Sequence, residues 1–407
     1  MHPPDTVSTK RAWWRGAELY ALALAVGLAG AALVHGNKHP QDPPLALLYV
    51  AVALLAFPAV DRVLQTGEGV LLPVTALLVA VGLVTTYRLQ PHLVAYQAAW
   101  VCAGLALSVA SFRMAHRPLN PQRLATPLAA LLVTVSLFPW GWAWVERGLP
   151  IRTPAEAAVV EVASELAKLL ALVLGVAELT RGKVRGYVVA AWAASATLWL
   201  LRGDVGTAAV MVWVALALAY CAAASLGPVL AGAGGFLVMA GLAYATVPQL
   251  TERLRGWVNP WADRLGAGYP LVQSLFAVAA GGLAGAGPGA GYPELVPQSH
   301  AGFVLAAVAE EWGFAGVTAL VAGYAVWTGR AVRAAGQAGA PWVRLLAAGA
   351  AALVASQAFL AAAGAVGVVP PADVPMPFVS AGGVSAAAQL ALLGAVLAAP
   401  RVREELR

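Results

Sequence analysis

Charged residues are scarce in this 407-residue chain, because Asp, Glu, Lys and Arg together make up 11% of it while hydrophobic residues make up 60%. Soluble domains usually carry about 25% charged residues. A water-soluble globule of this size could not be covered with so little polar surface, and an intrinsically disordered chain would be far more polar. The composition therefore indicates a polytopic membrane protein.

Cysteine is nearly absent too, with only Cys102 and Cys221. Both lie in apolar stretches, so we expect small core residues rather than a disulfide framework. The sequence also lacks a phosphate-binding Walker loop, a Cys/His spacing for metal and a Gly-x-Ser-x-Gly turn. The net charge of +6 is typical of basic cytoplasmic loops in a membrane protein, so we predict no nucleic-acid partner.

Long apolar runs dominate the chain instead. A helix needs about 20 mostly apolar residues to cross the hydrocarbon layer, and twelve segments meet this requirement. The runs are continuously apolar and do not alternate, which favours an all-α helix bundle over a β-barrel. The predicted spans are 17–35, 45–61, 69–87, 93–112, 124–144, 158–179, 185–201, 204–223, 227–247, 302–329, 343–367 and 382–400.

Positive charge is distributed unevenly among the connections. All but one of the even-numbered connections carry Lys or Arg, as do both termini, whereas the odd-numbered connections are poorer in them. The positive-inside rule then places both termini in the cytoplasm. We predict a multi-pass protein of the plasma membrane with cytoplasmic tails 1–16 and 401–407 and a membrane domain 17–400.

Residues 248–301 form an unusual connection, predicted to lie outside the cell. They are too polar and too rich in Gly and Pro to span a membrane. A connection of this length is far above the usual one, which favours a functional role.

Ionisable residues inside the predicted spans are costly in lipid and mark candidate functional positions. Glu161, Glu165 and Lys168 share one helix face. They form either a structural ion pair between helices or the wall of a polar cavity. Glu310 and Glu311 point in different directions on their helix, so at least one is expected to have a packing or capping role.

Two further polar residues flank spans. Asp204 precedes a predicted helix, so it is either an N-cap or a member of a site. His300 precedes the tenth span, where a histidine is either an interfacial hydrogen-bonding group or a site residue.

Five motifs, in order, resemble those of the SEDS family (shape, elongation, division and sporulation), which includes FtsW, RodA and SpoVE. The resemblance covers about residues 70–400. The motifs are Ser164-Glu165-x-x-Lys168, Gly203-Asp204-Val205-Gly206-Thr207, Arg253 to Pro260 with Trp257 at the family's Phe, the series Pro297, His300, Phe303, Glu310, Glu311 and Gly313, and Pro375-Met376-Pro377-Phe378-Val379-Ser380-Ala381-Gly382-Gly383-Val384-Ser385.

The resemblance implies a ten-helix core, here with two extra helices, and a large outer loop. It implies a peptidoglycan glycosyltransferase of cell division or cell shape that joins lipid II (the lipid-linked disaccharide-pentapeptide) into glycan strands. A class B penicillin-binding protein is the implied partner, and Lys and Arg, with a divalent cation (Mg or Mn), would hold the diphosphate. The implied substrate-binding residues are Lys168, Asp204, Arg253, His300, Ser380, Gly382 and Gly383.

The sequence departs from the family at the residues that the resemblance places around one cleft near His300. The family's base, an Asp two residues after the His, is replaced by Gly302, and Ala381 and Val384 replace a Tyr and a Ser. Asp373, which stands where the family usually has Gly, and Glu165 are the candidate relocated bases.

Three hypotheses follow from these departures. The chain is a working glycosyltransferase whose base has moved, or an inactive relative that binds lipid II or a transpeptidase and regulates wall synthesis. The third is a flippase for lipid-linked precursors. The polar motifs cluster outside, which favours a one-sided site over a path through the bilayer.

Overall fold

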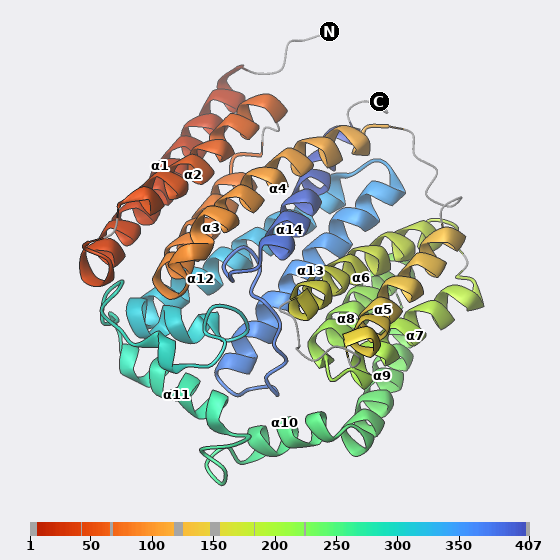
Figure 1. The fold of residues 1–407 in the computed structure, drawn as a ribbon. Coiled ribbons are helices and arrows are strands. Elements are labelled where there is room, and N and C mark those ends of the chain that lie inside the picture. Colours follow the sequence, from red (N-terminus) through yellow and green to blue (C-terminus); the bar gives the residue numbers. More distant parts are fainter. Residues whose placement is uncertain are drawn as a thin grey trace.

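The computed structural model is a bundle of helices (Figure 1). It describes residues 6–41, 43–65, 68–117, 125–146, 155–182, 184–223 and 225–403, and within these ranges it has no strand. The helices are α1 (Thr6–Lys38), α2 (Leu45–Leu64), α3 (Leu71–Leu89), α4 (Val94–Ala115), α5 (Ala125–Glu146), α6 (Ala155–Leu179), α7 (Gly186–Leu201), α8 (Val205–Ala223), α9 (Leu226–Thr246), α10 (Pro248–Val258), α11 (Tyr269–Gly281), α12 (Val304–Gln337), α13 (Pro341–Ala365) and α14 (Gly383–Ala398).

Each of the twelve predicted spans coincides with one of these helices. In the described part of the chain, nine helices are long and apolar enough to cross a membrane. The other three are α6, which carries several charged residues, and α7 and α14, which have 16 residues each. The protein is therefore a multi-pass membrane protein, and the count of twelve crossings stays a prediction.

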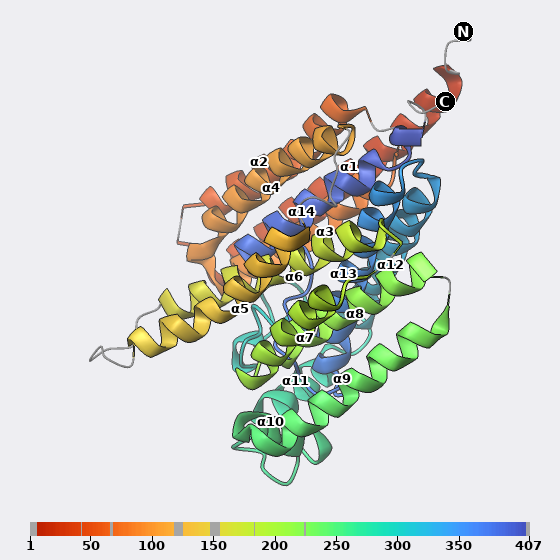
Figure 2. The same ribbon diagram turned by 90° about the vertical axis from the view of Figure 1, so that its right-hand side faces the viewer.

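Consecutive long helices run in opposite directions, so α1 begins and α14 ends at the same end of the bundle (Figures 1 and 2). Helices α10 and α11 lie at the other end, which we call the α10–α11 end. Residues 248–301 are thus not a plain loop, because they form these two short helices. Residues 6–16 of the predicted tail belong to α1, while residues 1–5 and 404–407 lie outside the described residues. Which end faces the cytoplasm stays a prediction.

Small residues let the central helices approach closely. A Cβ on Gly104 of α4 would lie 2.8 Å from the Cα of Ala387 on α14, and one on Gly394 would lie 2.0 Å from the carbonyl oxygen of Ser108. Neither position has room for a side chain. The Gly and Ala richness of the sequence thus serves helix packing, as membrane helices commonly use it.

Two clusters of buried apolar side chains hold the bundle together. The larger is built mainly from α1 to α4 and α12 to α14, and the smaller from α5 to α9. Helix α6 contributes to both, because Leu172 belongs to the larger cluster and Ala167 to the smaller. The polar residues at the α10–α11 end therefore lie where the two clusters meet.

The expectation of core cysteines was wrong for Cys221, which is exposed near the end of α8; Cys102 is partly buried. In a membrane protein the surface that faces lipid is as apolar as the core, so an apolar stretch does not tell the two apart.

A break in α12 at Gly313 (φ +68) receives the Gly-rich segment 282–292. Glu310 and Glu311 accept hydrogen bonds from backbone N–H groups of this segment at 2.8 and 3.0 Å. The Nε of Arg88 donates to Glu311 at 2.7 Å. Both glutamates therefore fasten the segment to the bundle, which confirms the packing role expected for at least one of them.

Candidate functional site

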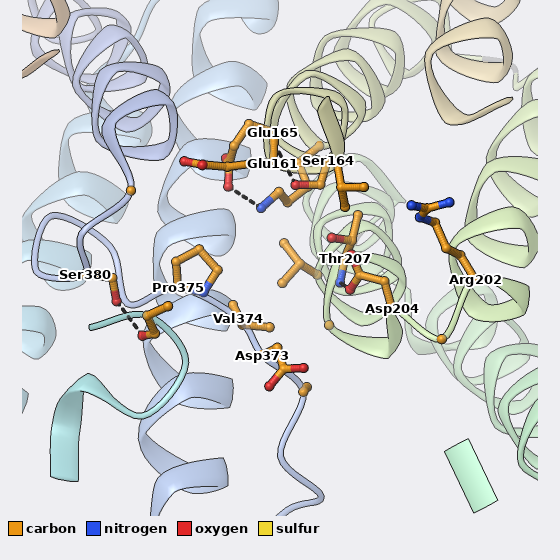
Figure 3. Close-up of a pocket in the computed structure, with 18 of the residues that line it drawn as sticks. Glu161, Ser164, Glu165, Arg202, Asp204, Thr207, Asp373, Val374, Pro375 and Ser380 are labelled. Carbon is orange, nitrogen blue, oxygen red and sulfur yellow. Dashed lines mark hydrogen bonds and ion pairs between the residues drawn. The ribbon is translucent and has the colours of Figure 1, made fainter. Parts of the chain in front are cut away.

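A cavity of about 650 Å³ lies at the α10–α11 end (Figure 3). Its walls come from α6, the α7–α8 link, the start of α10, the segment before α12 and the α13–α14 link. Ten residues are assigned from the sequence to substrate binding or to the present or expected position of the base, and eight of them line the cavity. They are Glu165, Lys168, Asp204, Arg253, His300, Asp373, Ser380 and Gly382.

The other two positions, Gly302 and Gly383, are not among the lining residues. Gly383 starts α14, where a Cβ would lie 2.3 Å from the Cδ1 of Trp100, so it serves packing. Gly302 lies next to the lining residue Asp373, because a Cβ on Gly302 would be 3.1 Å from the Cα of Asp373 and 3.6 Å from its Oδ1.

Glu165 and Lys168 form an ion pair in the cavity wall. The Nζ of Lys168 lies 2.5 Å from Oε1 of Glu165, and both side chains are 3% exposed. Both residues belong to α6, so the pair does not join two helices as the first interpretation has it. The second interpretation, the wall of a polar cavity, agrees with the structure. Glu161, one turn away, also lines it, and its Oε1 is buried without a hydrogen-bond partner among the described residues.

Asp204 caps α8 and also lines the cavity. Its Oδ1 accepts a hydrogen bond from the backbone N–H of Thr207 at 2.8 Å, as expected of an N-cap. Burial raises the pKa of Asp204, while the Thr207 hydrogen bonds and the charge of Lys168 oppose this rise. A Cβ on Gly206 would lie 2.3 Å from the carbonyl oxygen of Ala372, so this turn contacts the α13–α14 link directly.

Asp373 lies on the α13–α14 link in a left-handed backbone conformation (φ +51). Its Oδ2 is 2.6 Å from Nη2 of Arg253 on α10, and the two side chains are 34% and 39% exposed, respectively. A left-handed conformation is unfavourable for Asp compared with Gly. The ion pair with Arg253 thus holds the carboxylate in a partly exposed position in the cavity lining.

The segment that carries Ser380 is joined to the segment that carries His300. The hydroxyl of Ser380 donates to the carbonyl of Ala301 and accepts from the N–H of Met376, both at 2.8 Å. The N–H of Ala381 donates to the carbonyl of His300 at 2.8 Å. The Ser380 hydroxyl thus holds the backbone at Met376 and the backbone at Ala301 in place. Burial lowers the pKa of His300, which favours the neutral imidazole.

The sequence reasoning missed two polar residues of the cavity, Arg202 and Gln249. Arg202 precedes the Gly203-Asp204 turn, which is a usable signal, and its Nη1 donates to the carbonyl of Pro139 at 3.1 Å. Gln249 lies in the first turn of α10, and no sequence pattern points to it.

A divalent cation stays a prediction. Among the described residues, no group of three or more His, Cys, Asp or Glu side chains is arranged to hold a metal ion. The carboxylates of Glu165 and Asp373 are paired with Lys168 and Arg253 instead. The described donor set does not fit a metal site, so we derive no step through a cation.

Comparison with known proteins shows which family the sequence matches. Residues 68–405 match the FtsW/RodA/SpoVE family, described as cell cycle proteins. The chain is 30% identical to the peptidoglycan glycosyltransferase RodA of Mycobacterium tuberculosis, over 98% of this chain and 92% of that protein. It is 36% identical to the probable peptidoglycan glycosyltransferase FtsW of Alkalilimnicola ehrlichii, over 48% of this chain and 50% of that protein.

Two solved structures are similar in fold. One comes from work on the structural coordination of polymerization and crosslinking by a peptidoglycan synthase complex. It has a TM-score of 0.62 and 25% identity, over 82% of this chain and 97% of that chain. The other is the rod shape determining protein RodA of Thermus thermophilus, with a TM-score of 0.56 and 22% identity, over 82% and 96% of the chains. Helices α1 and α2 precede the matched range, and α3 to α14 lie within it. The chain belongs to the FtsW/RodA/SpoVE family.

Proposed function

We propose that this protein is a peptidoglycan glycosyltransferase that joins lipid II molecules into glycan strands at the outer face of the cell membrane, in cell-shape maintenance or division. The observation that carries the proposal is the position of Asp373. Its carboxylate is partly exposed and lines the cavity, and a Cβ on Gly302, where the family resemblance expects a base, would lie 3.6 Å from its Oδ1.

The proposed chemistry uses the two sides of the cavity differently. The Asp373 carboxylate takes the proton of the acceptor's sugar hydroxyl. The oxygen of that hydroxyl forms a bond to the anomeric carbon of the donor sugar, and the bond from that carbon to the diphosphate breaks. Lys168 and Arg202, which line the same cavity, supply positive charge for the leaving diphosphate.

Arg253 contacts one oxygen of Asp373, Oδ2, and a carboxylate has a second oxygen that can accept a proton, so Oδ1 can receive the hydroxyl proton while the ion pair is formed. Both side chains are partly exposed, so the ion pair can open without burying a charge. An incoming substrate hydroxyl can replace Arg253 as the partner of Asp373, and a hydroxyl or phosphate oxygen can replace Asp373 as the partner of Arg253.

The position of the cavity supports a one-sided site. Its lining residues come from α6 between Val160 and Lys168, from the first two turns of α8, from the start of α10 and from the links at that end. A flippase would need a polar path that continues to the opposite end. With the α10–α11 end outside, both termini lie in the cytoplasm, in agreement with the charge pattern.

A transpeptidase of the class B penicillin-binding type is the partner that we propose. The similar solved structure concerns a synthase complex that coordinates polymerization with crosslinking. Crosslinking consumes the glycan strands that the proposed activity makes.

The test is a polymerisation assay with purified protein and lipid II. We expect wild-type protein to make glycan strands and Asp373→Asn to reduce the rate by about 10²–10⁴-fold, as for loss of a positioned base, with lipid II binding retained. Glu252→Gln is the matched control, because Glu252 is exposed on the same helix as Arg253 and does not line the cavity.

Two outcomes would count against parts of this proposal. Polymerisation that survives both Asp373→Asn and Glu165→Gln would refute a relocated base at either residue. Tight binding of lipid II by a wild-type protein that makes no strands would favour the regulatory alternative.

A further inference from the structure

A second, smaller cavity of about 160 Å³ lies next to the first. The two cavities share Arg253 and Asp373 in their linings. The ion pair between these side chains therefore stands between the cavities, and it is partly exposed. When the pair opens, the proposed base faces both spaces.

Ring-bearing side chains form much of the lining of the second cavity. The indole of Trp257 lines it, and its Nε1–H donates to the carbonyl of Gly367 at 2.8 Å. This bond satisfies the only polar group of the indole and fixes the ring, so the rest of the ring offers an apolar surface. The other ring-bearing residues of the lining are Pro270, Pro297, Phe303 and Pro371.

Polar side chains with planar hydrogen-bonding groups complete the lining. Besides Arg253 and Asp373, Gln298 contributes an amide; its backbone is left-handed (φ +55) and its side chain is exposed. A pyranose ring has apolar C–H faces and hydroxyl groups around its edge. An aromatic surface with a guanidinium, a carboxylate and an amide nearby matches that distribution.

Other ligand classes fit less well. An isoprenoid chain in this cavity would remove water from the Arg253–Asp373 pair without offering it a hydrogen bond, which is costly. The diphosphate would meet the carboxylate of Asp373, whereas Lys168 and Arg202 lie in the first cavity. The small volume suits a single sugar ring.

We propose that the second cavity is a saccharide subsite, in which Trp257 stacks against the sugar ring next to the one whose hydroxyl reaches Asp373. This inference rests on the proposed function for the identity of the sugar, which is an N-acetylated hexose of the glycan. The subsite would hold the acceptor so that its reacting ring stays beside the base.

The test uses a probe without lipid or phosphate, the soluble disaccharide of N-acetylglucosamine and N-acetylmuramic acid. Binding is measured by saturation-transfer NMR on the full chain in detergent. We expect Trp257→Ala to weaken binding about tenfold, as for the loss of one stacked ring, and Trp257→Phe to bind within about threefold of wild type because a ring remains. Trp261→Ala is the matched control, since Trp261 is 50% exposed on the adjoining link and lies outside both linings.

A thermal-unfolding scan of each variant shows whether Trp257→Ala folds. If it does not, Gln298→Ala tests the same subsite at an exposed side chain, with an expected loss of about threefold for one hydrogen bond. Failure of wild-type protein to bind the disaccharide, or wild-type binding by both Trp257→Ala and Gln298→Ala, would overturn the subsite.

The test also separates this inference from the proposed function. If the protein binds the disaccharide through Trp257 but makes no strands from lipid II, the subsite is supported and the glycosyltransferase activity is refuted. If the protein makes strands but does not bind the disaccharide, the glycosyltransferase activity is supported and the subsite is refuted.

Discussion

A Cβ on Gly302 would lie 3.1 Å from the Cα of Asp373. The position that the family resemblance assigns to the base and the residue that we propose as the base are therefore direct neighbours. The family resemblance expects a carboxylate in the segment before α12, where this chain has Gly302, and Asp373 stands on the α13–α14 link that packs against that segment. We propose that the site has its carboxylate in nearly the same place, supplied from a different element.

The first prediction is that the two positions can be exchanged. Gly302→Asp combined with Asp373→Gly should retain polymerisation within about tenfold of wild type, because either carboxylate serves as the base. Gly at 373 also suits the left-handed backbone there (φ +51). Rates of strand formation from lipid II provide the measurement.

The single changes provide the contrast. Asp373→Gly alone should be inactive, and Gly302→Asp alone should be slower than wild type, because the new carboxylate crowds Asp373 and competes for Arg253. A double variant no faster than Asp373→Gly would show that the two positions are not equivalent.

The second prediction concerns the Glu165–Lys168 pair. Lys168→Ala leaves Glu165 charged and 3% exposed, so we expect a loss of about 3–5 kcal/mol in the free energy of unfolding. Adding Glu165→Ala should return most of that stability, because the buried carboxylate that lost its partner is then absent as well. Unfolding in detergent measures both changes.

Lipid binding distinguishes a structural role of Lys168 from a role in substrate binding. Both Lys168→Ala and the double variant should bind a diphosphate-bearing lipid more weakly, since each lacks a phosphate counter-charge. If the stable double variant binds the lipid as wild type does, Lys168 is a structural residue only.

The third prediction is a pH dependence at His300. Burial lowers the pKa of His300, so the unfolded chain takes up the proton first as the pH falls. Stability should therefore decrease as the pH falls below about 6.5, the ordinary histidine pKa. The melting temperature in detergent should drop less between about pH 7 and about pH 5 in His300→Gln than in wild type. His92→Gln, at an exposed position, should behave like wild type; equal drops in all three proteins would exclude this role.

The fourth prediction tests orientation by cysteine labelling in a background with Cys102→Ala and Cys221→Ala. Leu265→Cys lies at the α10–α11 end at a position that is 92% exposed, so an impermeant reagent should label it in intact cells. Gly336→Cys, exposed at the far end of α12, should be labelled only after lysis. The reverse pattern would invert the proposed topology.

The sequence by itself determined the helices and the ingredients of the site. Each predicted span became a helix because an apolar run of this length in lipid has to satisfy its backbone hydrogen bonds internally. Short-range spacing placed Glu165 with Lys168, and Asp204 at the start of α8, because those contacts lie within one helical turn.

The tertiary structure decided which distant segments meet. No local pattern pairs Arg253 with Asp373 or places Gly302 against that residue, because these contacts depend on how α10, α12 and the α13–α14 link pack at one end of the bundle. The same holds for Cys221, since lipid-facing and core-facing apolar residues look alike along the chain. Periodicity acts over a few residues, whereas the cavity is made by packing between helices that lie far apart in the sequence.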